Sequence, residues 1–413
     1  MANTVASYNK LKHLHALEIL LAAYPILGQY VYGGFHLELF LLLVMDVLAL
    51  RREKGILKCK PLMWFSAIAL IHELVVFLIT GANNQTHVNN IISIVIFVFS
   101  VFIIAPAVDF RKLSGAIKII SIFCMLGLVY HFLMIQTGHS VTPIQILPDP
   151  GSTSRLHGVG YRPVSFFWEP AGYILYMMLP LFISLIEKRF FFSAIIIFTV
   201  LLSTSTNGIV FAFIIIVAYA LTQKISNSLK IGMVIMGFIF VFFLFNSSLF
   251  ESGVEKIKET EYEYTARLYN GPTILTGLPH EHLILGIPRF NVYEYYTKTD
   301  YLSGTLLLEK NEEIFLPTFY SIIVRYGLIS FFFYLWLLIF IAKKSRRIRP
   351  YLIVIVVSMF SQSALFNLSW TNTMIFMFSF VAYDMNQQPI ESTNIRVKKV
   401  LKDESTYANN TIC

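Results

Sequence analysis

The chain has 413 residues, of which 56% are hydrophobic and only 14% are charged. A soluble domain of this size could not bury so much apolar surface, and repeated apolar runs of about 20 residues are typical of membrane-spanning helices. The net charge of +8 is therefore interpreted by the location of the basic residues, and it does not indicate a nucleic-acid partner. The three cysteines, Cys59, Cys124 and Cys413, are far apart, which argues against a disulfide framework and a cysteine metal site.

The apolar runs predict an all-α, polytopic integral membrane protein with about 12 transmembrane helices. The first run ends without a small-residue cleavage pattern, so we expect a retained helix and not a signal peptide. The run 190–221 is too long for one crossing of about 30 Å, and Asn207-Gly208 is a turn signal, so it is divided into two short helices. The other expected helices cover 14–32, 35–50, 61–80, 91–108, 114–135, 169–186, 231–245, 315–341, 351–366 and 370–383.

Two long polar segments, at about 136–166 and 246–314, separate groups of helices. We expect 1–383 to form a single polytopic membrane domain and 384–413 to form a disordered polar tail in the cytoplasm. Basic clusters recur in every second connection, at Arg51, Arg111, Lys188, Lys224, Lys343 and in the tail. The positive-inside rule places these clusters in the cytoplasm and both long segments on the extracytoplasmic side.

A polar loop meets an apolar segment at Arg162–Gly172. Pro170 suits the first turn of a helix, where its missing N–H costs nothing. Glu169 then lies at the helix N-terminus, where the helix dipole favours an anion. Together with Arg162 in the loop, this carboxylate could form a site for phosphate binding or glycosyl transfer. The alternative is an interfacial salt bridge that anchors the helix.

Three further features lie on the extracytoplasmic face in this topology. The first is the Ser203–Gly208 turn, which includes Asn207. The second is the long segment that carries Arg267, Arg289, His280 and His282, and the third is Asn311 just before the next helix. The two histidines are two residues apart, a spacing that would place both on one side of a strand. We expect them at the loop surface or in contact with sugar, and not in a metal site.

Five ionisable residues fall inside the expected helices: Glu18, Glu38, Asp46, His72 and Glu73. Such groups are costly to bury in a membrane, which makes each a candidate functional residue. Pairing between helices is the alternative, and we do not assign any of them to catalysis.

The pattern formed by Arg162, Ser165, Phe167, Glu169 and Pro170 resembles the signature of bacterial O-antigen and capsule repeat-unit polymerases of the Wzy type. Related O-antigen ligases carry a similar element. Three more stretches resemble elements of the family in the same order: 202–208, 285–288, and the stretch from Asn311 to Ile329. The resemblance covers roughly residues 150–335.

The chain also departs from the family pattern at three places. An arginine is common where this chain has Thr206 or Asn207. Many members, ligases above all, have a histidine where this chain has Lys310, and a glutamate is usual where it has Arg325. These departures weaken the ligase interpretation more than the polymerase interpretation, and they leave the catalytic base unassigned.

The resemblance implies a GT-C-like glycosyltransferase that polymerises undecaprenyl-diphosphate-linked oligosaccharides on the outer face of the bacterial inner (plasma) membrane. Arg162, with Arg267 or Arg289, would bind the leaving diphosphate, because a guanidinium stays ionised and binds two phosphate oxygens. A base or orienting acceptor is also needed, for which the candidates are Glu169, His280 and His282. Substrate contacts are expected from Ser165, Asn207 and Asn311.

No cofactor or metal is expected. The expected partners are the lipid-linked oligosaccharide, membrane lipids, and flippase and chain-length regulator proteins, without nucleic acid. The nearest alternative function is an O-antigen ligase, which transfers finished glycan to a lipid A-core acceptor. A polysaccharide transporter or flippase, which would need essential ionisable groups near the middle of the membrane, is a second alternative. A non-catalytic assembly subunit is a third.

Overall fold

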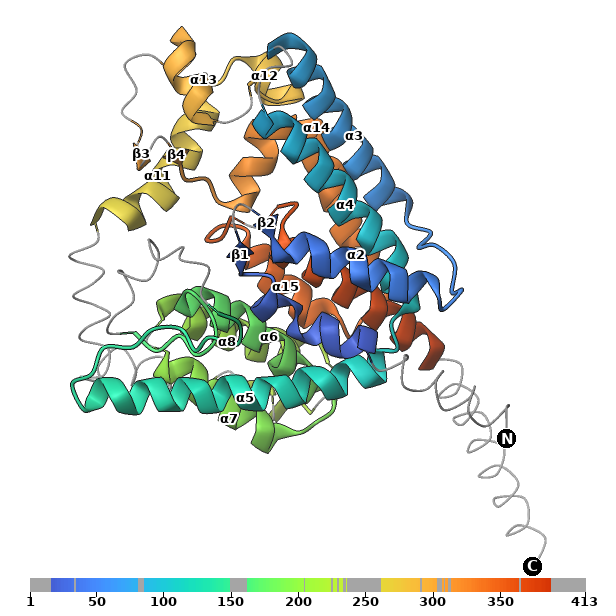
Figure 1. The fold of residues 1–413 in the computed structure, drawn as a ribbon, viewed down its shortest axis with the longest axis vertical. Helices are drawn as coiled ribbons and strands as arrows, with labels where there is room; N and C mark the ends of the chain where they lie inside the picture. The colour runs from blue at the N-terminus through green and yellow to red at the C-terminus, as the bar shows by residue number, and fades with distance from the viewer. Residues whose placement is uncertain are drawn as a thin grey trace, which may run out of the picture.

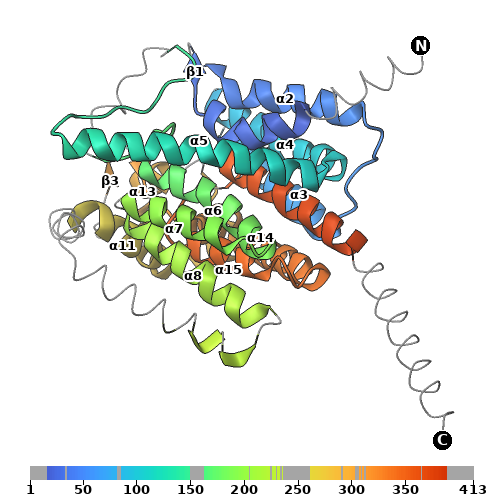
Figure 2. The same cartoon turned by 90° about the horizontal axis from the view of Figure 1, so that it is seen from below.

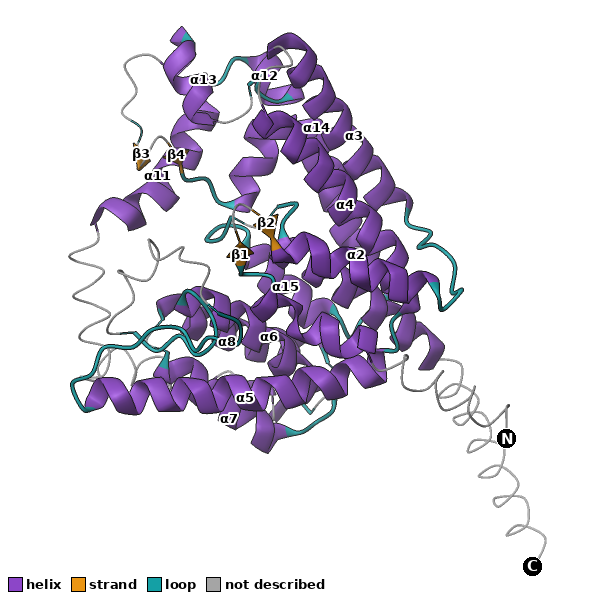
Figure 3. Ribbon diagram, in the orientation of Figure 1, coloured by secondary structure: helices purple, strands orange, loops and turns teal. Residues whose placement is uncertain are grey.

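A computed structural model describes residues 16–387 except 33–34, 81–84, 149–161, 204, 224–225, 229, 233–234, 236–260, 290–291, 303–306, 308, 311–312 and 364. This part of the chain is mostly helical (Figures 1 and 3). Two short antiparallel hairpins accompany the helices. Strand β1 (Val31–Tyr32) pairs with β2 (Phe35–His36), and β3 (Glu309–Lys310) pairs with β4 (Glu313–Ile314).

Helices account for most of the chain from its first described residues onward. The first helix is Ala16–Leu27. It is followed by α2 (Leu37–Leu50), α3 (Lys60–Thr80), α4 (Gln85–Ala107), α5 (Phe110–Gln136), α6 (Pro170–Ile186), α7 (Phe190–Leu202), α8 (Thr206–Thr222), α11 (Glu261–Gly277), α12 (His280–Leu285), α13 (Val292–Lys298), the 3-10 helix η3 (Asp300–Leu302), α14 (Thr318–Lys344) and α15 (Arg349–Ser358). A last helix covers 368–387.

Four helices in the described part of the chain are long and apolar enough to cross a membrane: α3, the 90–107 portion of α4, α5 and α14. Five shorter helices are also apolar: Ala16–Leu27, α6, α7, Asn207–Thr222 within α8, and α15. Large apolar side chains such as Leu78, Phe191 and Phe332 are exposed on the outside of the bundle. Outward-facing apolar surface of this kind is expected for helices that contact lipid.

Several expected helix boundaries agree with the structure. Helix α6 begins at Pro170, with Glu169 as its N-cap residue. The apolar run 190–221 is divided into α7 and α8, which meet around Ser203 and Ser205. Because the start of a proline-capped helix and a polar break in an apolar run are local signals, both could be predicted from the sequence.

Other boundaries were wrong. The first helix ends at Leu27, not residue 32, because the chain enters the β1–β2 hairpin. The 315–341 helix begins at Thr318 and is interrupted at Gly327, which has φ 79° and ψ 169°. The 351–366 helix ends at Ser358. The last helix extends through the expected start of the tail, where Asp384 is buried and accepts a hydrogen bond from Ser345 (2.6 Å). Most of 231–245 lies outside the described residues.

The segment 246–314 was expected to be a loop, but its described part is largely helical. Helices α11 and α13 form a small hydrophobic core with Ile287, which follows α12; this core is centred on Ile274, Ile287 and Tyr295, and it includes Val324 of α14. Figure 1 shows α11–α13 away from the N-terminal ends of α3 and α5. The sequence of this segment is weakly apolar, so its helices are stabilised by this packing more than by local periodicity.

Two of the basic connections bind the ends of neighbouring helices. Arg52, after α2, forms an ion pair with Glu18 (2.6 Å) and donates to the Ala107 carbonyl at the end of α4 (2.7 Å). Arg346, after α14, donates to the Thr222 carbonyl at the end of α8 (3.1 Å). Figure 2 shows how α5, α6, α8 and α15 lie alongside one another in this bundle. The clustering agrees with the alternation of basic connections in the sequence.

Candidate functional site

The segment Arg162–Gly172 is held by hydrogen bonds to elements far away in the sequence. The backbone N–H groups of Val164 and Ser165 donate to His131 Nδ1 of α5 (3.4 and 3.2 Å), and the Ser165 hydroxyl donates to the Cys124 carbonyl (2.7 Å). The Trp168 N–H donates to Gln29 Oε1 (3.0 Å). The segment is therefore connected both to α5 and to the end of the first helix.

Ser165 has a left-handed backbone conformation, with φ 58°. This conformation is uncommon for a residue other than glycine, and it persists where surrounding contacts require it. The Ser165 carbonyl also accepts from the Ile144 N–H (2.8 Å), and the side chain is fully buried. The described contacts of Ser165 therefore hold the loop in place, while a direct substrate contact by its hydroxyl stays a prediction.

The other two predicted residues of the segment lie at its ends. Glu169 is exposed at the N-terminus of α6, and its side chain makes no capping hydrogen bond. Its carboxylate is thus accessible from solvent, as a base would need to be. Arg162 is half-buried at the start of the described segment. Between them, Phe167 is buried against the rings of Tyr173 and Tyr176 of α6.

The turn between α7 and α8 packs beside this segment. A side-chain atom on Gly208 would lie 2.8 Å from Cδ1 of Ile174 of α6, which means that the start of α8 and α6 are in close contact. Asn207 is half-buried in the first turn of α8. The structure therefore brings the Arg162–Gly172 segment and the serine-rich turn to the same end of the bundle, as the topology predicted.

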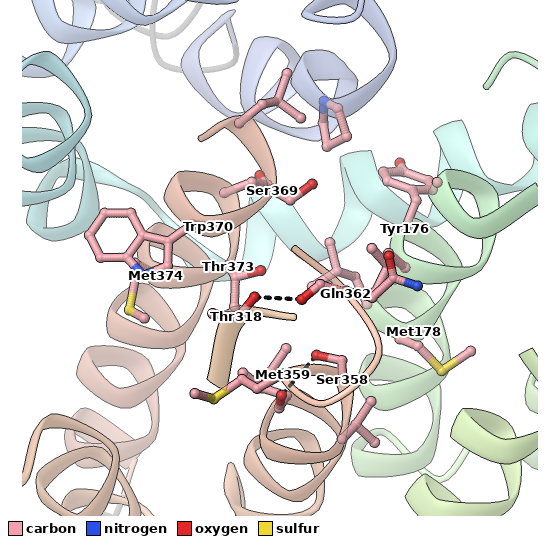
Figure 4. A pocket seen from close by; sticks show the side chains of 18 of the residues that line it. Tyr176, Met178, Thr318, Ser358, Met359, Gln362, Ser369, Trp370, Thr373 and Met374 are labelled. Carbon is pink, nitrogen blue, oxygen red and sulfur yellow. Dashed lines mark hydrogen bonds between the residues drawn. The ribbon is translucent and has the colours of Figure 1, made fainter. Parts of the chain in front are cut away.

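A cavity of about 200 Å³ lies next to the segment, and we call it the central cavity. Phe167, Gly172 and Tyr176 form one wall, and Gln29 lies at another. The remaining walls come from the start of α14, from α15 and the chain after it, and from the start of the helix 368–387 (Figure 4). Most of these walls are helix ends that lie opposite the basic connections. The cavity therefore lies toward the end of the bundle that carries the Arg162–Gly172 segment.

One wall of the central cavity is organised by Thr318. Its N–H and its hydroxyl both donate to the Gln362 carbonyl (2.8 and 2.6 Å), as Figure 4 shows for the hydroxyl. The Phe319 N–H donates to the Met359 carbonyl (2.9 Å). The first N–H groups of a helix have no partner within that helix. At the start of α14, the carbonyl groups of the chain that follows α15 supply these partners.

The predicted glycine element lies against the interruption in α14. The Ile287 N–H donates to the Val324 carbonyl (2.9 Å). A side chain on Gly286 would collide with the Arg325 carbonyl, and one on Gly327 would collide with the Ile284 carbonyl. Both glycines have positive φ angles. Glycine is required at both positions because the two backbones approach too closely for a Cβ atom.

An ion pair supports this contact from α3. Glu73 is buried and lies 3.0 Å from the guanidinium of Arg325, and the Tyr326 hydroxyl donates to the same carboxylate oxygen (3.0 Å). The ring of His72 packs edge-on against Tyr326. Glu18 and Glu73, two of the ionisable residues noted within the expected helices, are thus paired between elements.

The histidine pair was expected in an extended loop, but it lies in helix α12. His280 is exposed, whereas His282 Nδ1 lies 2.8 Å from the Tyr295 hydroxyl. In a helix, residues two apart point in different directions, so the two histidines do not share a side. Burial lowers the pKa of His282 and raises the pKa of Tyr295 to about 12. The lowered pKa therefore favours the neutral form of His282 at pH 7.

The arginines of the long segment are only partly described. Arg289 lies 4.0 Å from Glu294, a carboxylate that also binds Lys298 at 3.0 Å. Arg267 falls within α11, and its side chain lies outside the described part of the structure, as does the whole of Asn311. Helix α12 lies against α14 and near the end of α3, α13 lies beside η3 and β4, and both helices are apart from α6 (Figure 1). The segments that carry Arg162 and Arg289 are therefore not adjacent.

Sequence reasoning missed the cavity residues contributed by the end of the chain. Gln362, Trp370 and Thr373 line the central cavity although the predicted signature lies near residue 170. A signal was present, because polar residues interrupt the apolar runs at 361–373. The sequence also contained an indication of the Glu73–Arg325 pair. An acidic residue lies inside one expected helix, and an arginine lies inside another where the resembled family usually has a glutamate. Among the described residues, no three His, Cys, Asp or Glu side chains gather closely enough to hold a metal ion.

Comparison with models of known protein families gave no match, and comparison with the sequences of characterised proteins gave none either.

Proposed function

We propose that this chain is a glycosyltransferase of the bacterial plasma (inner) membrane that joins oligosaccharide repeat units carried on undecaprenyl diphosphate. In this proposal the apolar helices form about 12 membrane spans. The reaction takes place on the extracytoplasmic face, at the end of the bundle opposite the basic connections. The proposal rests on the resemblance of the Arg162–Pro170 pattern to repeat-unit polymerases.

The observation that carries the proposal is how the Arg162–Gly172 segment is built. Hydrogen bonds to α5 and to Gln29 hold it in a constrained backbone conformation, and it forms a wall of the central cavity. An interfacial anchor would need only a salt bridge between Arg162 and Glu169. The additional contacts and the left-handed Ser165 are more typical of a segment whose side chains must be positioned accurately.

In the proposed reaction, a hydroxyl of the acceptor repeat unit attacks the anomeric carbon of the donor sugar. The bond from that carbon to the diphosphate oxygen breaks, and the diphosphate leaves with both electrons. Arg162 stabilises the negative charge that develops on it. The acceptor's proton passes to a base, for which exposed Glu169 is the candidate in the same segment, whereas His280 and His282 belong to α12, which lies apart from α6.

The test is Arg162→Ala and Arg162→Lys in the native host, scored by the length ladder of the surface polysaccharide. We expect Arg162→Ala to lower the rate by on the order of 10²–10³ and to leave single repeat units. Arg162→Lys should recover little, because an ammonium cannot bind two oxygens in a fixed geometry. Arg189→Ala, an exposed arginine at the opposite end, is the matched control. A full ladder in Arg162→Ala cells, at normal protein level, would refute the proposal.

Transport of a lipid-linked oligosaccharide is the second candidate function. It is favoured by the Glu73–Arg325 ion pair between two candidate membrane spans, because ionisable residues within spans often mark transport pathways. The same cells separate the two functions. A polymerase defect leaves single repeat units at the cell surface, whereas a transport defect leaves them inside the cell. Polymer that forms but is never transferred to its final acceptor would indicate a ligase.

A further inference from the structure

The central cavity is uncharged, which limits what it can hold. Among the described residues that line it, none is Asp, Glu, Lys, Arg or His. A diphosphate placed there would lose its hydration without gaining a cation, which is strongly unfavourable. The cavity therefore suits an uncharged group, and the diphosphate of a lipid-linked substrate would have to lie elsewhere.

The lining is also too polar for a hydrocarbon chain. Tyr176, Ser369, Thr373 and Gln362 place hydroxyl and amide groups around the cavity (Figure 4). The Tyr176 hydroxyl and Gln362 Nε2 are buried and make no hydrogen bond to any described residue. Tyr176 itself is only 3% exposed. A hydrocarbon in the cavity would leave these groups without partners, which carries a full desolvation penalty for each.

Aromatic side chains complete the lining. Trp370, Tyr334 and Phe167 lie around the same space. Aromatic rings offer flat apolar faces beside the polar groups, a combination that matches a sugar ring, which has apolar faces and hydroxyl edges. An apolar cavity of about 150 Å³ can hold benzene. The central cavity, at about 200 Å³, is therefore large enough for one six-membered sugar ring.

We propose that the central cavity is a binding site for one uncharged pyranose ring of the oligosaccharide repeat unit. Tyr176 and Gln362 hydrogen-bond its hydroxyl groups, and Trp370 contacts its apolar face. This inference rests on the proposed function, because it identifies which part of the same substrate the cavity takes. In this inference the sugar ring is bound in the cavity between the helices, and the diphosphate is bound outside it by Arg162.

The test measures binding to the full-length protein in lipid nanodiscs by saturation-transfer NMR titration. The probes are the repeat-unit oligosaccharide released from the host's own surface polysaccharide, farnesyl phosphate and inorganic pyrophosphate. The variants are Tyr176→Phe and Gln362→Met, which remove the polar groups and nearly keep the volume. Tyr24→Phe is the matched control, because Tyr24 is also buried with a hydroxyl that has no described partner, yet it does not line the cavity.

We expect Tyr176→Phe and Gln362→Met each to weaken oligosaccharide binding by about 3- to 10-fold, as expected for one lost neutral hydrogen bond. Pyrophosphate binding should not change, and Tyr24→Phe should bind all three probes like the unmodified protein. The inference is overturned if oligosaccharide binding is unchanged in both cavity variants. It is also overturned if these variants alter farnesyl phosphate binding instead, since the cavity would then hold the lipid chain.

The two proposals can fail separately. If cavity variants lose oligosaccharide binding but Arg162→Ala cells keep a full polysaccharide ladder, the sugar site stands and the polymerase proposal fails. If Arg162→Ala collapses the ladder and the cavity variants bind normally, the polymerase proposal stands and the sugar site is wrong.

Discussion

Glu73 of α3 and Arg325 of α14 form an ion pair of 3.0 Å across 252 residues of sequence. The pair lies directly beside the interruption of α14 at Gly327, where α12 and Gly286 are in contact with the helix backbone. This charged contact therefore joins two candidate membrane spans at the place where the long segment rests on them.

Glu73→Gln should destabilise the protein by about 1–3 kcal/mol. A fully buried pair that loses one partner costs roughly 3–5 kcal/mol, and the loss here is smaller because the Arg325 side chain is 28% exposed. Thermal unfolding of the purified protein measures the change. The double variant Glu73→Gln/Arg325→Gln should be more stable than Glu73→Gln alone, because the guanidinium that has lost its carboxylate is also removed. Lys298→Gln, which breaks an exposed pair, should change stability by less than about 1 kcal/mol. Equal losses in Glu73→Gln and Lys298→Gln would contradict this interpretation.

Gly327→Ala should detach the long segment from α14. The added Cβ would collide with the Ile284 carbonyl, and backbone atoms cannot rotate away as a side chain can. We expect faster protease cleavage within α11–α13, measured on intact spheroplasts, together with a loss of polysaccharide length. Gly138→Ala is the matched control. Gly138 has a similar φ of 83° but nothing within 4 Å of an added Cβ, so it should show only the backbone cost of about 1 kcal/mol. Indistinguishable cleavage rates for the two variants would rule out the close backbone contact.

Ser165→Ala should lower stability by about 1 kcal/mol, because the Cys124 carbonyl loses its hydroxyl partner inside the protein. Ser165→Gly should be less harmful, since glycine adopts the observed φ of 58° without strain. The two unfolding temperatures test this order. If Ser165→Ala and Ser165→Gly keep the stability of the unmodified protein but raise the KM for the lipid-linked substrate, the direct substrate contact predicted from the sequence is favoured.

Stability should fall between pH 7 and pH 5 partly through His282. Burial lowers its pKa in the folded protein, so below the ordinary value of about 6.5 the unfolded chain binds more protons. This contribution to stability is complete above that value and is lost as the pH falls toward the folded pKa. Unfolding temperatures of His282→Gln should therefore depend less on pH in this window than those of the unmodified protein. His280→Gln, which changes an exposed side chain, should retain the original dependence, and a reduced dependence in it alone would contradict the assignment.

The sequence alone was sufficient for features that depend on neighbouring residues. Long apolar runs predicted α3, α5 and α14 because a helix satisfies its backbone hydrogen bonds within one segment. Pro170 marked the start of α6, and the serine-rich break divided α7 from α8. The alternation of basic connections predicted that the ends of α2, α4, α8 and α14 lie on one side, and the contacts of Arg52 with α4 and of Arg346 with α8 agree with this prediction.

Only the tertiary structure decided which distant residues meet. The partner of Glu73, the burial of Ser165 and the packing of Gly286 on Gly327 depend on how helices separated by many residues are packed, and no local pattern records that packing. The same holds for the central cavity, whose walls combine the end of the first helix, the start of α6 and the last helix. Hydrophobic composition determined that the chain would form helices, whereas complementary shape and charge between those helices determined where a site could exist.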